Sequence, residues 1–291
     1  MSLSKTTLGP FELYTIETGD FRLDGGAMFG VVPKTLWSRG LAADDNNRIP
    51  MTMRCLLIKS NNTGKVYLVD NGAGTKFSDK MEGIYQLKYK DKNLENSLKY
   101  HGFSIEDISD IIFTHLHFDH CGGSSFYNEF EELELTFPDA NYHVVDKHWD
   151  NANNPNAREK ASFLPENIQP IKDSGKLNLV AENHEYEKGL SALSVNGHTI
   201  GQQLPVIKAD GKTLVFVADL LPTHVHVPLP WVMGYDMYPV QTLDEKEAFL
   251  KQASKNEWYL YLEHDAHEEV IRVQHEEGRF SVAETLSLND L

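Results

Sequence analysis

Three histidines and one aspartate occupy four of six consecutive positions in this chain: His115, His117, Asp119 and His120. Imidazole nitrogen and carboxylate oxygen are ligands for Zn²⁺ and for Fe, Mn or Ni ions. His115 and His117 are two residues apart, so an extended turn can direct both toward one ion, while Asp119 and His120 can face a neighbouring ion. Burying so many polar groups without a cation would be unfavourable. The segment therefore predicts a metal centre rather than a set of incidental loop histidines.

The elements around this segment suit such a centre. A short apolar run at 110–114 is typical of a buried strand, and it ends directly before His115. Three later runs are also expected to be strands: 190–195, 213–218 and 258–262. Each is followed by a possible ligand, and these ligands are His198, Asp219 and His264. Sites in layered α/β proteins are built at strand ends and in the loops after them, so four strands can deliver ligands to one place.

The remaining patterns predict alternating strands and helices. Period-two alternation predicts a strand at 11–16, and a hairpin is expected where 55–59 and 66–70 flank the turn residues 61–64. Further expected elements are a helix through Leu94 and Leu98 that stops near Gly102, a capping-box start at 104–107, a strand at 142–145, and a capping box at 242–245 before a helix through Ala253. Gly122 and Gly123 permit a tight turn and close backbone approach into a following helix.

Composition narrows the class of protein. The chain has 291 residues, of which 41% are hydrophobic and 24% charged, so we expect residues 1–291 to form one globular domain. A formal net charge of −16 argues against nucleic acid as the main partner. No apolar run is long enough to span a bilayer, and residues 1–10 do not resemble a signal peptide. Two cysteines, Cys55 and Cys121, do not make a disulfide framework, so we expect a reduced, cytoplasmic protein.

The string from His115 to His120 resembles the His-x-His-x-Asp-His signature of the metallo-β-lactamase superfamily. The later parts of that pattern match in order at Gly197-His198-Thr199, Ala218-Asp219 and Glu263-His264-Asp265. The resemblance implies an α/β fold, the four-layer αββα sandwich. It also implies that His115, His117 and His198 hold one metal, that Asp119, His120 and His264 hold the other, and that Asp219 bridges them.

A centre of this kind implies hydrolysis. Two divalent ions, most simply Zn²⁺ with Fe, Mn or Co as alternatives, lower the pKa of a bound water toward about 7 and so supply hydroxide at neutral pH. They also polarise the oxygen of the bond to be broken. Asp119 and Asp219 are the candidate catalytic carboxylates that orient the nucleophile and pass a proton to the leaving group. The resemblance favours Asp119 as the main proton shuttle.

Within the superfamily, three segments resemble the quorum-quenching N-acyl-homoserine lactonases and organophosphate hydrolases: 24–34, 219–223 and 230–236. The expected substrate is therefore a small molecule with a lactone ring. The chain departs from the lactonases at Pro222, where they carry a tyrosine that helps the substrate carbonyl. Tyr235 and Tyr238 are the candidates for supplying that phenol from the next loop.

An apolar pocket for an acyl chain is also expected, although each of its members could equally belong to the core. The candidate substrate-binding residues are Met28, Phe29, Trp231, Met233 and Tyr235. His224 and His226 are candidates for the pocket wall, and His267 is an alternative to His264 as ligand. The other histidines are expected on the surface or in the core: His101, His143, His148, His184 and His275. Cys121 is expected to be a small apolar filler.

Other activities remain open at this point. An arylesterase, phosphotriesterase or β-lactam hydrolase would use the same centre. A metal-dependent nuclease is disfavoured by the acidic charge, and a mononuclear-iron redox or dioxygenase protein would lack part of the second ligand set. A non-catalytic module is least favoured because every ligand position is filled. The family resemblance also suggests a homodimer.

Overall fold

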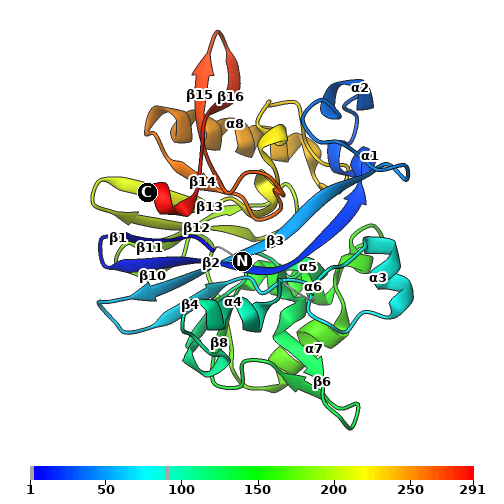
Figure 1. The fold of residues 1–291 in the computed structure, drawn as a ribbon, viewed down its shortest axis with the longest axis vertical. Coiled ribbons are helices and arrows are strands. Elements are labelled where there is room, and N and C mark those ends of the chain that lie inside the picture. Colours follow the sequence, from blue (N-terminus) through cyan, green and yellow to red (C-terminus); the bar gives the residue numbers. More distant parts are fainter. Residues whose placement is uncertain (1–2, 90–91) are drawn as a thin grey trace.

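Two seven-stranded sheets form the centre of the protein in the computed structural model, which describes residues 3–89 and 92–291 (Figure 1). The first sheet has the order β1 (Lys5–Leu8), β2 (Phe11–Asp24), β3 (Arg48–Ser60), β4 (Val66–Val69), β5 (Asp110–Ile112), β8 (Asn141–Val145), β9 (Leu177–Val180). The second has the order β10 (Glu185–Glu187), β11 (Leu190–Val195), β12 (Gln202–Ala209), β13 (Lys212–Phe216), β14 (Tyr259–Tyr261), β15 (Val270–Glu276), β16 (Arg279–Leu286). A small hairpin of β6 (Ser125–Tyr127) and β7 (Leu133–Leu135) lies apart from both.

Both sheets mix parallel and antiparallel pairs. Strands β4, β5, β8 and β9 run parallel to one another, as do β13 and β14, and the other neighbours are antiparallel. The carboxyl ends of parallel neighbours lie at one edge of a sheet. The loops that follow β13 and β14 therefore leave the second sheet at the same edge.

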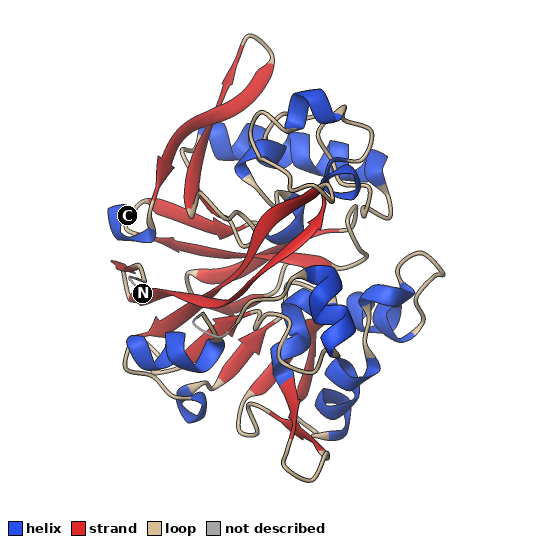
Figure 2. Cartoon of the chain, turned by 45° about the vertical axis from the view of Figure 1, so that its right-hand side comes forward, coloured by secondary structure: helices blue, strands red, loops and turns tan. Residues whose placement is uncertain are grey.

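Helices lie outside the two sheets, as Figure 2 shows. The α-helices are α1 (Gly25–Phe29), α2 (Lys34–Trp37), α3 (Asp79–Tyr85), α4 (Leu94–Tyr100), α5 (Phe118–Cys121), α6 (Asp146–Asn153), α7 (Pro165–Asp173) and α8 (Pro239–Lys255). Short 3₁₀ helices are η1 (Ile105–Asp107), η2 (Gly122–Ser124), η3 (Lys160–Ser162), η4 (Ala218–Leu220), η5 (His224–His226) and η6 (Leu288–Asp290). Helices α4 and α6 pack on the first sheet and α8 on the second, which gives the expected four-layer αββα sandwich.

Side-chain alternation on β3 shows how the layers are held together. Leu56 and Ile58 belong to the core that joins both sheets and continues beneath α8. Their neighbours Cys55 and Leu57 belong to a second core beneath α4, α6 and α7. Successive residues of a strand point to opposite faces, so one buried strand supplies both cores. Removing a buried leucine from such a core typically costs about 2–5 kcal/mol.

Most of the expected elements are confirmed, including the hairpin of β3 and β4, the strands β5, β8, β11, β13 and β14, and the capping box of Ser104 and Asp107. The capping box expected at 242–245 is wrong. The N-cap of α8 is Tyr238, four residues before Thr242, because Pro239, with its fixed φ, occupies the first helical position. Glu245 instead accepts hydrogen bonds from the backbone N–H groups of Asn196 and Gly197.

Gly122 and Gly123 are confirmed as points of close backbone approach. A Cβ on Gly122 would lie 2.1 Å from the carbonyl oxygen of Ala73, and one on Gly123 would lie 2.2 Å from that of Asn71. Instead of leading into a full helix, they form the single turn η2. Among residues 3–89 and 92–291, no helix is long and apolar enough to cross a membrane.

Candidate metal centre

The seven predicted ligands meet at one place, although they come from both sheets. The loop after β5 carries His115 and His117, and α5 carries Asp119 and His120. His198 follows β11, Asp219 lies in η4 after β13, and His264 follows β14. All seven side chains are buried, with at most 8% of each residue exposed. The site is therefore assembled by the packing of the sheets.

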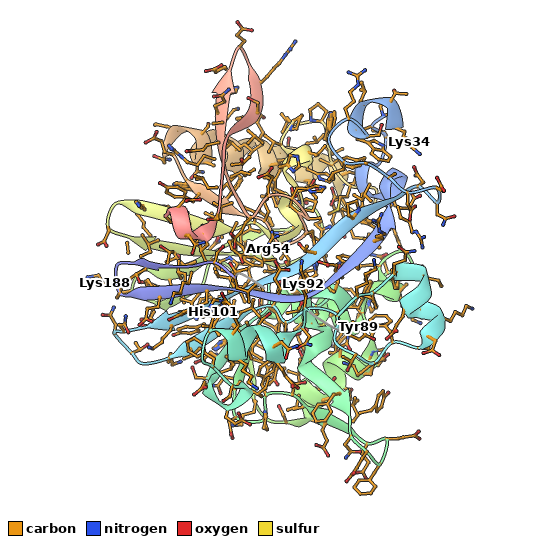
Figure 3. All side chains as sticks on the ribbon, in the orientation of Figure 1. Lys34, Arg54, Tyr89, Lys92, His101 and Lys188 are labelled. Atoms are coloured by element: carbon orange, nitrogen blue, oxygen red, sulfur yellow. The ribbon has the colours of Figure 1, made fainter. Side chains whose placement is uncertain are left out.

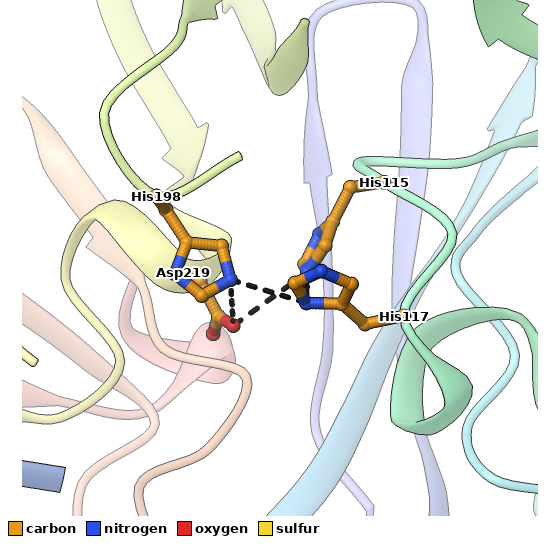
Figure 4. A group of neighbouring side chains, drawn as sticks. All are labelled: His115, His117, His198 and Asp219. Carbon is orange, nitrogen blue, oxygen red and sulfur yellow. Dashed lines mark hydrogen bonds and ion pairs between the residues drawn. The ribbon is translucent and has the colours of Figure 1, made fainter. Parts of the chain in front are cut away.

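The first cluster consists of His115, His117, His198 and Asp219 (Figure 4). His117 Nδ1 lies 3.0 Å from His115 Nε2 and 3.2 Å from His198 Nε2, and His198 Nε2 lies 3.0 Å from Asp219 Oδ2. Two nitrogens bound to one tetrahedral Zn²⁺ at 2.0–2.1 Å are about 3.3 Å apart. The spacing therefore fits one ion.

The second cluster consists of Asp119, His120 and His264. His120 Nε2 and His264 Nε2 are 3.1 Å apart, and Asp119 oxygens lie 3.9 and 3.8 Å from them. Asp219 Oδ1 lies 3.1 Å from His264 Nε2 and, although buried, accepts no hydrogen bond from the described residues. One oxygen of Asp219 thus faces each cluster. An unsatisfied buried carboxylate oxygen between two imidazole groups fits a bridging metal ligand.

Each of the five histidines uses its other ring nitrogen on a partner. The partners are Thr114 Oγ1 for His115 (3.0 Å), Glu159 Oε1 for His117 (3.2 Å), Asp70 Oδ2 and Glu263 Oε2 for His120 (3.0 and 3.1 Å), Asp236 Oδ1 for His198 (3.0 Å), and Thr52 O for His264 (2.8 Å). Such contacts fix the tautomer and direct the other nitrogen's lone pair toward the ion.

Strand β3 holds the segment that carries His264. The buried Arg54, labelled in Figure 3, donates from Nη1 to the carbonyl oxygen of Leu262 at 2.8 Å and forms an ion pair with Glu17 at 3.2 Å. The Thr52 hydroxyl donates to the carbonyl oxygen of Glu263 at 2.8 Å. The contacts of Arg54 with Leu262 and of Thr52 with Glu263 cross from the first sheet to the second, so they hold the His264 segment against the first sheet.

Burial and charge determine the protonation of the ligands. Burial lowers the pKa of His115 well below its usual range, so its ring is neutral and its lone pair is available. Burial also lowers the pKa of His198, but the Asp219 and Asp236 carboxylates outweigh it and raise that pKa to about 10. Asp219 likewise overcomes burial to raise the pKa of His264 to about 9. In the metal-free protein, the protons on His198 and His264 compensate the negative charge of the Asp219 carboxylate. A bound divalent ion would take over that compensation.

A cavity of about 210 Å³ opens beside the clusters. Met28, Met233 and Tyr235 line it, as the sequence predicts. Tyr85 and Arg158 also line it, and no pattern in the sequence singles out either of them. The hydroxyl groups of Tyr85 and Tyr235 have no hydrogen-bond partner within the described residues, so both are available to a bound molecule.

The structure does not place Phe29 and Trp231 on the cavity wall, so this part of the prediction is corrected. Phe29 is fully buried, with ring centroids 5.1 Å from Trp37 and 4.3 Å from His226 in stacked pairs. Trp231 packs edge-on against Phe29 at 6.0 Å. Phe29 belongs to the core behind Met28, and Trp231 is a partly buried residue that packs against that core.

The other candidates also have structural positions. His226 contacts the carbonyl oxygen of Met28 at 2.9 Å and His224 pairs with Asp265, so neither lines the cavity. His267 lies outside both clusters. Tyr238 is the N-cap of α8 and is absent from the cavity wall. Cys121 is a buried core residue, as expected.

His143 and His148, expected on the surface or in the core, are both buried and connect separate segments of the chain. His148 accepts a hydrogen bond from the Leu116 N–H at 2.7 Å and contacts the Ile200 carbonyl oxygen at 2.7 Å. His143 Nε2 contacts the Asp110 carboxylate at 2.8 Å. Their partners are distant in sequence, so spacing gives no signal for either.

The fold and the paired ligand clusters are those of a metal-dependent hydrolase. The model of the metallo-beta-lactamase superfamily matches residues 54–264, so the chain belongs to that superfamily. No curated protein sequence matches the chain.

Several solved structures resemble the whole chain. A structure described as a probable metal-dependent hydrolase from Staphylococcus aureus has 27% sequence identity and a TM-score of 0.85, and the match covers 97% of this chain and 100% of that one. AidC, a dizinc quorum-quenching lactonase, has 23% identity and a TM-score of 0.80, with 98% of each chain covered. AbOPH, a hydrolase of the beta-lactamase superfamily, has 18% identity and a TM-score of 0.78, with 96% of each chain covered. At these identities, the likeness to AidC and AbOPH establishes the fold.

Proposed function

We propose that this metal-dependent hydrolase holds two divalent ions, most simply Zn²⁺, and opens the lactone ring of N-acyl-homoserine lactones. One observation carries the dinuclear part of the proposal. The Asp219 carboxylate directs Oδ2 toward His198 and Oδ1 toward His264, so a single residue serves both clusters. The complete second cluster disfavours a mononuclear-iron redox protein.

Two bound ions would lower the pKa of water and stabilise negative charge on the substrate oxygen. The protein's own contribution to proton transfer falls to Asp119. Its oxygens lie farther from the histidines than those of Asp219, and its side chain lines the cavity. The Asp119 carboxylate is therefore placed to accept a proton from water and to pass it to the departing alkoxide.

The cavity wall supports a substrate with an apolar chain and a polar ring. Leu23, Met28, Met51 and Met233 give the wall an apolar part that suits an acyl chain. The Tyr235 hydroxyl has no hydrogen-bond partner among the described residues. It can donate to the lactone carbonyl oxygen in place of the tyrosine that the lactonases carry at the position of Pro222. AidC was solved with the product N-hexanoyl-L-homoserine, which shows that this fold accommodates such a molecule.

A substrate panel tests the proposal. N-acyl-homoserine lactones of different chain length, aryl esters, phosphotriesters and a β-lactam would be compared by kcat/KM on one preparation of known metal content. We expect the lactones to give the highest values. Preference for an aryl ester or phosphotriester would contradict the lactonase assignment while retaining the hydrolase.

A further inference from the structure

Glu159 lies behind the first cluster, in the segment between α6 and η3, and no pattern in the sequence singles it out. We propose that Glu159 is a positioning residue that aligns the His117 ring and also contacts Thr199, beside His198. This inference rests on the proposed metal centre and adds a residue outside the seven ligands. It is carried by the contacts of one buried carboxylate, whose residue is 2% exposed.

The first contact fixes the His117 ring. His117 directs Nδ1 toward His115 Nε2 at 3.0 Å and His198 Nε2 at 3.2 Å. Its Nε2 faces outward, 3.2 Å from Glu159 Oε1. A neutral imidazole that offers Nδ1 to a metal must carry its hydrogen on Nε2. The Glu159 carboxylate accepts a hydrogen bond from this N–H group and so selects the tautomer of His117 that can bind a metal through Nδ1.

The second contact reaches the other loop. The Thr199 hydroxyl donates to the same Oε1, and Thr199 directly follows the ligand His198. Asn151 of α6 donates from Nδ2 to Glu159 Oε2 at 3.1 Å and contacts Thr199 Oγ1 at 3.3 Å. All three partners donate to Glu159, so an ionised carboxylate suits the position. An amide there would either lose an acceptor or place N–H against a donor.

The hydrogen bonds of His148 separate the alignment of the His117 ring from the placement of the two loops. His148 of α6 joins the backbone of Leu116 to that of Ile200, each at 2.7 Å. These residues lie beside His117 and Thr199 in the same two loops. Because His148 holds the loops by their backbone, changing Glu159 should leave the loops in place and disturb chiefly the His117 ring.

Metal titration of a Glu159→Gln variant tests the proposal. Metal-free protein would be titrated with Co²⁺, with the visible absorption of the bound ion recorded alongside competition by a chelator. Changing a residue that orients a metal ligand typically weakens metal affinity about 10–100-fold. We expect one of the two ions to bind that much more weakly with an altered spectrum, and the other to keep its wild-type affinity.

Asp110→Asn is the matched control. Asp110 is also a buried carboxylate that contacts an imidazole, His143 Nε2 at 2.8 Å, but it touches none of the seven ligands. It should lower stability and leave both Co²⁺ affinities unchanged. Thr199→Val provides a milder second variant, because it removes one donor while keeping the Glu159 carboxylate. It should weaken the same ion by a smaller factor.

The outcomes separate this inference from the proposed function. If the Glu159→Gln variant binds both ions as tightly as the wild type does, the positioning role is overturned. Equal weakening of both ions in Glu159→Gln and Asp110→Asn would also overturn it, because general destabilisation would then explain the loss. A wild-type chain that binds fewer than two ions would contradict the proposed centre itself, and that result needs no substitution.

Discussion

His117 Nδ1 and His198 Nε2 lie 3.2 Å apart, although one histidine follows a strand of the first sheet and the other follows a strand of the second. A metal bound by both would join the two sheets directly. The stability of the fold and the occupancy of the centre should therefore be linked.

Removing the metal should lower the stability of the protein. A ligand that binds only the folded state, at 1,000 times its dissociation constant, adds about 4 kcal/mol. We expect the melting temperature to fall by roughly 10 °C in chelator and to recover when Zn²⁺ is added. Thermal unfolding of metal-free and reloaded samples measures this, and identical melting curves would contradict the linkage.

Metal binding should release protons. The pKa values of His198 and His264, about 10 and about 9, lie above pH 8, and carboxylates, chiefly that of Glu263, outweigh burial to raise the pKa of His120 well above its usual range, so all three rings hold a proton in the metal-free protein at that pH. A ring nitrogen must lose its proton before it can bind a metal, so about three protons per chain should be released at pH 8. Calorimetry in buffers of different ionisation enthalpy counts them. Binding without proton release would show that these nitrogens do not coordinate.

The ligand string was predictable because it is local and because strand ends place the later ligands. The partners of the ligand histidines could not be predicted in the same way, because each lies at least 38 residues from its histidine in the sequence. These partners are Glu159, Asp236 and Asp70. Apolar pattern also could not separate the cavity wall at Met28 from the core at Phe29, because both positions are buried. Such distinctions depend on tertiary packing rather than on spacing.

Asp110 gives a pH-dependent prediction away from the centre. Burial raises its pKa, but hydrogen bonds from His143 and Lys65 outweigh this and lower it to about 2, against a usual value of 3.8. A carboxyl group whose pKa is lower in the folded than in the unfolded state stabilises the fold at pH values above its unfolded pKa. This stabilisation is lost as the pH falls through the folded pKa of about 2. In metal-free protein, Asp110→Asn should cost about 2 kcal/mol at pH 7. Urea unfolding should show the difference shrinking below pH 4, and a constant difference would refute the charge-based explanation.

The phenol of Tyr235 should act on the substrate oxygen. Removing one donor to a developing oxyanion typically lowers kcat about 100-fold. Tyr235→Phe should therefore reduce kcat for lactones while leaving metal content unchanged. Tyr85→Phe is the comparison, because Tyr85 lines the same cavity and the two variants together show which phenol acts on the substrate. Equal losses in the two variants would argue against a specific role for Tyr235.

The most direct test combines lactone ring opening, followed as proton release, with metal content measured on the same sample of wild type and His117→Ala. We expect about two ions per wild-type chain and ring opening that disappears in the variant. A chain that holds a single iron ion and hydrolyses no lactone would contradict the dinuclear centre.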